Sequence, residues 1–143
     1  MKKSPNDLKK YQSLTLNNGL RVLLIHNEDT DKSAAALAVN VGHFNDDIDC
    51  QGICHLLEHM LFLGNDEFED ANAFNDFITT SGGSINAQTG TEYTSYFYEV
   101  SAEHEHQAIA HFRAMLCGPT FSETHIEKEV KAINAEFLLK KKD

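Results

Sequence analysis

The segment Gly52-Ile53-Cys54-His55-Leu56-Leu57-Glu58-His59-Met60-Leu61-Phe62-Leu63-Gly64 sets two histidines and a glutamate within a run of apolar residues. Residues four apart on a helix lie about 40° apart around its axis, so His55 and His59 leave the same face. Two imidazoles at about 2.0–2.1 Å form half of a tetrahedral zinc shell. Glu58 projects from the flank of that face, where it could deprotonate a zinc-bound water instead of binding the metal.

The apolar surroundings of the H-x-x-E-H pattern strengthen the metal hypothesis. A helix that is apolar nearly all round is normally buried. Burying two histidines and a glutamate without partners is costly, and a metal ion is the simplest set of partners. The alternative is a pair of surface histidines on an ordinary helix, because short motifs also occur by chance.

A zinc site needs at least a third protein ligand, and we expect it in a last helix over residues 122–142. Thr124 and Glu127 have the spacing of a capping box near its start. Its packing face is predicted to be an apolar stripe at spacings of four, three and four. The stripe consists of Ile126, Val130, Ile133 and Phe137.

Glu129 and Glu136 are seven residues apart and share a face at the border of this stripe. A carboxylate at the edge of a packing face points toward a neighbouring element, so either residue is a candidate ligand. The alternative is that both are surface charges that pair with Lys128 or Lys140. Spacing alone leaves the two alternatives open.

Several further segments follow in an order and spacing similar to one family. They are residues 16–22, 52–64, 82–87, 91–96 and 129–136. On these segments the chain resembles the N-terminal part of the insulinase/pitrilysin family of zinc metallopeptidases, whose H-x-x-E-H order defines the inverzincins. The resemblance covers nearly the whole chain from Leu14 onward. Residues 31–37 are more similar to the insulin-degrading branch than to the processing-peptidase branch.

The family pattern implies roles residue by residue, with Zn²⁺ as cofactor. His55 and His59 match the two histidine ligands, and Glu136 matches the distal glutamate ligand. Glu58 matches the general base. Glu129 matches an acidic residue that supports the ligands from one double turn before Glu136.

Asn86 and Ala87 match the edge strand along which an extended peptide docks in this family. An exposed strand edge binds a peptide through main-chain hydrogen bonds, so the sequence specificity is loose. Without the family, Asn86 would be read as a simple turn or edge residue after the Gly82-Gly83 break.

The family's peptidase unit is much longer than this chain, with a second, similar domain and a C-terminal half that closes over the zinc. We therefore expect a fragment of a longer peptidase, weak or inactive in isolation; an unusually short stand-alone relative is the alternative. Peptide substrate and the missing C-terminal portion are the expected partners. Surface meant for the next domain is expected to promote self-association.

Two classes of function remain open. The first is the catalytic domain of a zinc metalloendopeptidase that hydrolyses peptide bonds by a zinc-bound water. The second is a non-catalytic module that binds zinc and peptides or serves in assembly. Glu58 favours the first class, because a purely structural relative has no reason to keep the base.

Composition excludes some partners. The formal net charge is −10, and no basic patch exists beyond Lys140-Lys141-Lys142, which argues against nucleic acid. Residues 1–6 contain no apolar signal region and no membrane span is visible, so we expect a cytoplasmic protein, or a periplasmic one if a leader was removed. Cys50 and Cys54 could be proposed as metal ligands, but they are expected to be buried, reduced thiols.

The fold class expected is α+β, a mostly antiparallel sheet with helices packed on one face, in one domain over residues 1–143 without a linker. The 143 residues, 41% of them hydrophobic, suffice for one core. An Asn17-Asn18-Gly19 turn predicts a hairpin. The expected strands are 14–16, 20–26, 33–41, 84–88 and 92–101, and the expected helices are the motif helix up to Gly64, 71–80, 103–116 and 122–142.

Overall fold

The computed structural model describes residues 3–68 and 70–141. The chain forms two compact units, of which the first ends at Asp31 and the second begins at Lys32. The single domain expected over residues 1–143 stays a prediction.

The first unit is a β-hairpin. Strands β1 (Lys10–Thr15) and β2 (Arg21–His26) pair antiparallel. Gly19 has a φ of 87°, a left-handed conformation that glycine adopts without steric cost, and its N–H donates to the Leu16 carbonyl at 2.9 Å. The predicted hairpin is therefore confirmed, although its first strand begins at Lys10 and not at Leu14.

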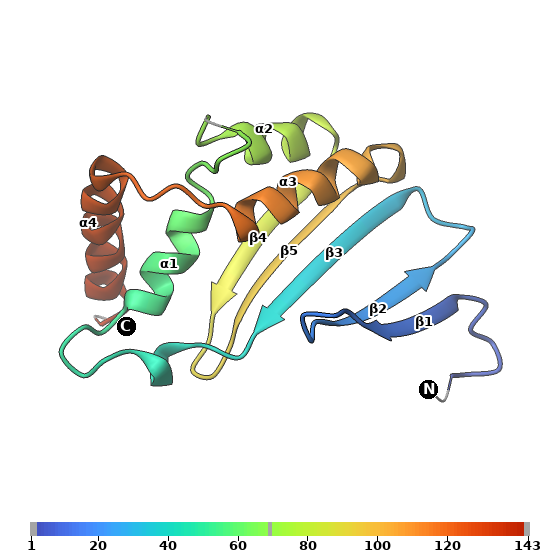
Figure 1. The fold of residues 1–143 in the computed structure, drawn as a ribbon, viewed down its shortest axis with the longest axis horizontal. Helices are drawn as coiled ribbons and strands as arrows, with labels where there is room; N and C mark the ends of the chain where they lie inside the picture. The colour runs from blue at the N-terminus through green and yellow to red at the C-terminus, as the bar shows by residue number, and fades with distance from the viewer. Residues whose placement is uncertain (1–2, 69, 142–143) are drawn as a thin grey trace. The chain divides into compact units, whose positions relative to one another are not determined.

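The second unit is built on a three-stranded sheet (Figure 1). Its strands are β3 (Lys32–Val39), β4 (Ser84–Thr89) and β5 (Thr94–Ser101), in the order β3-β5-β4 with both pairings antiparallel. Strand β4 is therefore an edge of this sheet. The last expected strand begins two residues later than predicted, because Tyr93 belongs to the turn before it.

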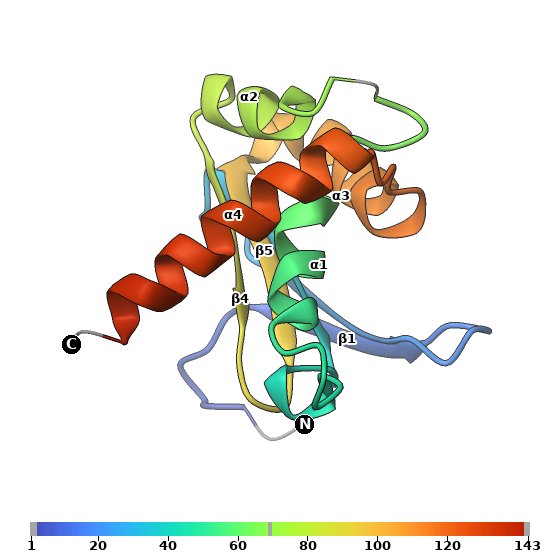
Figure 2. The ribbon, with the colours of Figure 1, turned by 90° about the vertical axis from the view of Figure 1, so that its left-hand side faces the viewer.

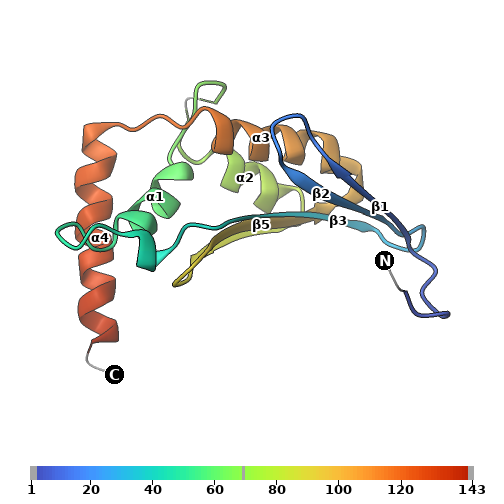
Figure 3. The ribbon, with the colours of Figure 1, turned by 60° about the horizontal axis from the view of Figure 1, so that its bottom comes forward.

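The helices of this unit cover one face of its sheet. Figure 3 shows α1 (Ile53–Leu61), α2 (Ala73–Thr80) and α3 (Glu105–Cys117) on the same side of the strands. Helix α4 (Glu123–Lys140) lies beside α1 (Figure 2). The predicted α+β class is thus confirmed. Within the described part of the chain, no helix combines the length and apolar character that a membrane span requires.

The hydrophobic core lies between the sheet and the helices. Alternate residues of β5 point into it, as a period of two requires: Tyr96, Tyr98 and Val100 are buried while Phe97 and Glu99 are exposed. The main helix residues packed against them are Ile78, Phe112 and Met115.

The sequence predicts that Ile109, Ala110, Phe112 and Met115 of helix α3 face inward. Phe112 and Met115 are buried as predicted, but Ile109 is 42% exposed and Ala108 is buried in its place. Positions 108, 112 and 115 follow the spacing of one helix face, and 109 lies about 100° further round.

The sequence also predicts that His104, His106 and His111 face solvent. His106 is exposed as predicted, and His104 is half-buried. His111 is half-buried and stacks on three aromatic rings, those of Phe68, Phe74 and Phe77. Burial lowers the pKa of His111, which favours the neutral ring in this apolar setting.

The packing face of α4 also differs from the predicted stripe. Val130 and Phe137 are 49% and 61% exposed. The half-buried positions include Ile126, Glu129, Ile133 and Glu136, so apolar and acidic residues alternate along this face. The cap is Ser122, whose hydroxyl accepts from the His125 N–H, so the capping box assigned to Thr124 is wrong. The end expected at Lys142 lies outside the described residues.

The start of α1 is fixed by one buried carboxylate. Asp46 accepts hydrogen bonds from the Gly52 and Cys54 N–H groups at 2.8 and 2.9 Å, which supplies partners for amides that a helix start leaves unpaired. Cys54 is buried as predicted, and burial raises the pKa of its thiol to about 11. Cys50 is exposed, so its predicted burial is wrong.

The core predicts that replacing two different isoleucines by alanine has very different effects on the free energy of unfolding. Ile78 is 0% exposed and Ile48 is 86% exposed. We expect Ile78→Ala to lower the free energy of unfolding by about 2–5 kcal/mol, since it removes packing and leaves a cavity. Ile48→Ala should change it by less than about 0.5 kcal/mol. Urea denaturation followed by circular dichroism measures both; equal losses would contradict this core.

Candidate metal centre

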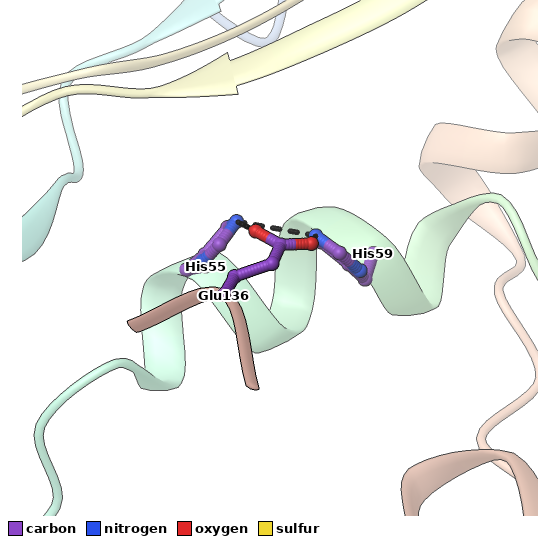
Figure 4. A group of neighbouring side chains, drawn as sticks. All are labelled: His55, His59 and Glu136. Carbon is purple, nitrogen blue, oxygen red and sulfur yellow. Dashed lines mark hydrogen bonds and ion pairs between the residues drawn. The ribbon is translucent and has the colours of Figure 1, made fainter. Parts of the chain in front are cut away.

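Helix α1 brings the two motif histidines together. The Nε2 atoms of His55 and His59 are 3.1 Å apart, and both rings are half-buried on the side of the helix that faces α4 (Figure 4). The surface-pair alternative does not describe this geometry, because both side chains are enclosed by a second helix. Burial first, and the neighbouring His59 second, lower the pKa of His55.

Glu136 on α4 completes a cluster of three. Its Oε2 lies 3.8 Å from His55 Nε2, and its Oε1 lies 4.0 Å from His59 Nε2. Figure 4 shows the carboxylate between the two imidazoles. Glu136 follows His55 by 81 positions and His59 by 77. Among the described residues, this is the only group of three or more side chains with metal-ligand spacing.

Glu129 contacts the Nδ1 atom of His59, on the side of the ring opposite the cluster. Its Oε2 lies 2.8 Å from His59 Nδ1, which makes the carboxylate the acceptor of an Nδ1–H proton. With Nδ1 protonated in a neutral ring, Nε2 carries the lone pair and faces His55 and Glu136. This arrangement, an imidazole oriented by a carboxylate behind it, is the one that metal-binding histidines commonly use.

These distances and donors fit a zinc ion. Ligand atoms about 2.0–2.1 Å from a tetrahedral ion lie roughly 3.3–3.4 Å from one another. The atoms of His55, His59 and Glu136 all lie within 4.8 Å of one another, so they are close to that spacing without any ion to draw them in. Two imidazoles and a carboxylate also form the ligand set of several catalytic zinc enzymes. Neither Cys50 nor Cys54 belongs to the cluster.

Glu58 makes its hydrogen bond to the sheet, and its charge also acts on the neighbouring His55. It is 8% exposed, and its Oε2 accepts a short hydrogen bond from the Thr89 hydroxyl at the end of β4. Burial raises the pKa of the nearby Tyr96 to about 12, and the charge of Glu58 contributes to that shift. Sequence reasoning missed Thr89, since a threonine at the end of a strand carries no signal of such a contact.

Asn86 and Ala87 lie on β4, the sheet edge next to α1. The Ala87 side chain is packed against the core, whereas Asn86 is exposed. The Asn86 Oδ1 accepts from the Ala87 N–H at 2.8 Å, so an arriving peptide would compete with this side chain for that amide. The structure therefore places both residues on an edge strand, and their substrate role stays a prediction.

Comparison with known proteins agrees with this geometry. Residues 21–140 match the family model described as Insulinase (Peptidase family M16). Human insulin-degrading enzyme is 41% identical over 134 residues, which are 94% of this chain and 13% of that protein. The A-factor-processing enzyme of Saccharomyces cerevisiae is 38% identical over 130 residues, which are 91% of this chain and 13% of that protein.

Solved structures show the same fold. The crystal structure of pitrilysin matches with a TM-score of 0.91 and 33% identity, over 96% of this chain and 15% of the pitrilysin chain. The structure of a protease from Helicobacter pylori matches with a TM-score of 0.81 and 26% identity, over 90% of this chain and 31% of that chain. The chain thus spans about an eighth of the length of the curated relatives named above. The family match covers most of its residues, and the chain belongs to the insulinase family of peptidases.

Proposed function

We propose that this chain is the zinc-binding catalytic portion of a metalloendopeptidase. The observation that carries the proposal is the convergence of His55, His59 and Glu136 from two helices, with Glu58 on the flank of the same face of α1. A zinc ion held by these three side chains would supply Lewis-acid activation of water and of the peptide carbonyl. Three protein ligands are the number that catalytic zinc sites use, whereas closed structural sites use four.

Other residues of the chain orient a ligand, accept a proton and bind the substrate. Glu129 orients His59 through the Nδ1–H and keeps its Nε2 lone pair toward the cluster. Glu58 accepts the proton that the attacking water loses and is therefore the general base. The exposed edge of β4 at Asn86 and Ala87 binds the substrate as an added strand, so the substrates are extended peptides of loose sequence.

A weak activity is expected from these 143 residues by themselves. The similar enzymes are several times longer, and rate depends on holding the substrate in line and stabilising its oxyanion as well as on activating water. Loss of one oxyanion donor typically costs about 10²–10³ in rate. A non-catalytic zinc- and peptide-binding module is the alternative that a total lack of turnover would favour.

Metal analysis tests the ligand assignment. The purified chain should bind one zinc, and His55→Ala or Glu136→Gln should lose it. Glu129→Gln should weaken zinc binding by about 10- to 100-fold, because it removes the acceptor behind His59. His106→Ala and Glu127→Gln are matched controls at exposed positions and should keep the wild-type zinc content. Equal zinc in all five variants would remove the assignment.

A second variant separates the base from the ligands. Glu58→Gln should keep one zinc per chain and lower peptide hydrolysis by about 10²–10⁴-fold, since the amide keeps the size of the side chain but cannot take a proton. Cleavage of an unstructured peptide, followed by mass spectrometry over hours, is the measurement. Loss of zinc together with activity would show that Glu58 is a ligand or a structural residue.

Self-association with a second copy of this chain is the third expectation. Phe137, Leu138 and Leu139 form an exposed apolar surface on α4, at 61, 50 and 67% exposure. Apolar surface of this kind favours association. Light scattering at rising concentration should show dimers or larger species, and Phe137→Ser should shift the mass toward the monomer. Ile48→Ser, at another exposed position, is the control. A monomer at all concentrations would contradict the expectation.

A further inference from the structure

Glu58 is a buried carboxylate with a single hydrogen-bond donor among the described residues. It is 8% exposed, and the donor is the hydroxyl of Thr89, which bonds to Oε2. A buried carboxylate is costly without hydrogen bonds, so its orientation follows its donor. Thr89 therefore determines where this carboxylate points.

The sheet places the Thr89 hydroxyl on the side of α1. Ile85, Ala87 and Thr89 are alternate residues of β4, and all three are half-buried while the residues between them are exposed. Side chains at alternate positions of a strand share a face. The contact between α1 and β4 then brings Thr89 against Glu58.

The backbone around Thr89 is held at several points. Thr89 pairs with Thr94 of β5, whose buried hydroxyl donates to the Val41 carbonyl at 2.8 Å. In the turn that follows, the Gly90 N–H donates to the Tyr93 carbonyl at 2.8 Å, and the Gly90 carbonyl accepts from the His43 N–H at 3.0 Å. A hydroxyl carried by such a backbone is a fixed donor and not a mobile one.

We propose that Thr89 is the positioning residue of Glu58. Its hydroxyl occupies Oε2 and so leaves Oε1 as the acceptor for the proton of the attacking water. The donor is a neutral hydroxyl, so this contact is a hydrogen bond and not a salt bridge. The inference rests on the proposed function for the role of Glu58, and on the hydrogen bond alone for its orientation.

The position of Thr89 also connects two parts of the proposed site. It lies on the same strand as Asn86 and Ala87, three and two residues away. A peptide paired with this edge and the carboxylate of Glu58 would then both contact strand β4.

The first test needs neither metal nor activity. Urea midpoints of the metal-free chain are compared for the wild type, Thr89→Val, Glu58→Leu and the double variant. Thr89→Val keeps the shape and the strand preference but removes the donor. Thr89→Val should lower the urea midpoint in the wild-type background. It should leave the midpoint unchanged in the Glu58→Leu background, because the acceptor of the Thr89 hydroxyl is then absent. The same shift in both backgrounds would overturn the hydrogen bond and the proposal with it.

The second test uses the zinc-loaded chain and peptide cleavage. Thr89→Val should keep one zinc and an unchanged KM while kcat falls by about 10- to 100-fold, the range expected for a hydrogen bond to a charged group. Thr89→Ser, which restores the hydroxyl, should recover most of kcat. Thr91→Val, at an exposed position of the neighbouring turn, should behave as wild type.

The outcomes distinguish a failure of the positioning role of Thr89 from a failure of the proposed function. A wild type with zinc and turnover, but with Thr89→Val equally fast, overturns the positioning role and leaves the proposed function intact. A wild type with neither zinc nor turnover overturns the proposed function, and the urea midpoints still decide whether Thr89 holds Glu58. A Thr89→Ser variant as slow as Thr89→Val overturns the role of the hydroxyl.

Discussion

Helix α1 carries two half-buried imidazoles and a buried carboxylate, and each of these groups has a polar partner. The partners come from two different elements. Helix α4 supplies Glu129 and Glu136 for the histidines, and strand β4 supplies Thr89 for Glu58. The cost of burying unpaired polar groups therefore ties together three segments that lie far apart in the chain.

The pitch of helix α1 points the Glu58 carboxylate and the His59 imidazole toward different elements. Glu58 and His59 are neighbours in sequence, but adjacent helical residues point about 100° apart. His59 consequently faces α4, whereas Glu58 faces the sheet. The proposed ligands and the proposed base are thus held by different elements, and a change in one set of contacts need not disturb the other.

Helix α4 shows why packing and hydrophobicity can diverge. Its half-buried face combines Ile126 and Ile133 with Glu129 and Glu136, and its more apolar C-terminal residues are exposed. A face that must meet two histidines cannot be uniformly apolar. The carboxylates that looked like the edge of the packing face are part of its centre.

The sequence by itself determined what depends on neighbours along the chain. The helical spacing of His55 and His59, the turn at Gly19 and the alternation of Tyr96 and Tyr98 are local consequences of helix, turn and strand geometry. Several motifs in a fixed order also pointed to the insulinase family, whose model then matched residues 21–140.

Only the tertiary structure decided which faces meet. It turned Ile109 outward and stacked the half-buried His111 on aromatic rings, because the direction in which α3 crosses the sheet is not encoded in the spacing of its own residues. It chose Glu129 for His59 and Thr89 for Glu58, contacts that span 70 and 31 positions. Contacts between distant segments depend on how whole elements pack, and periodicity within one element carries no information about its partner.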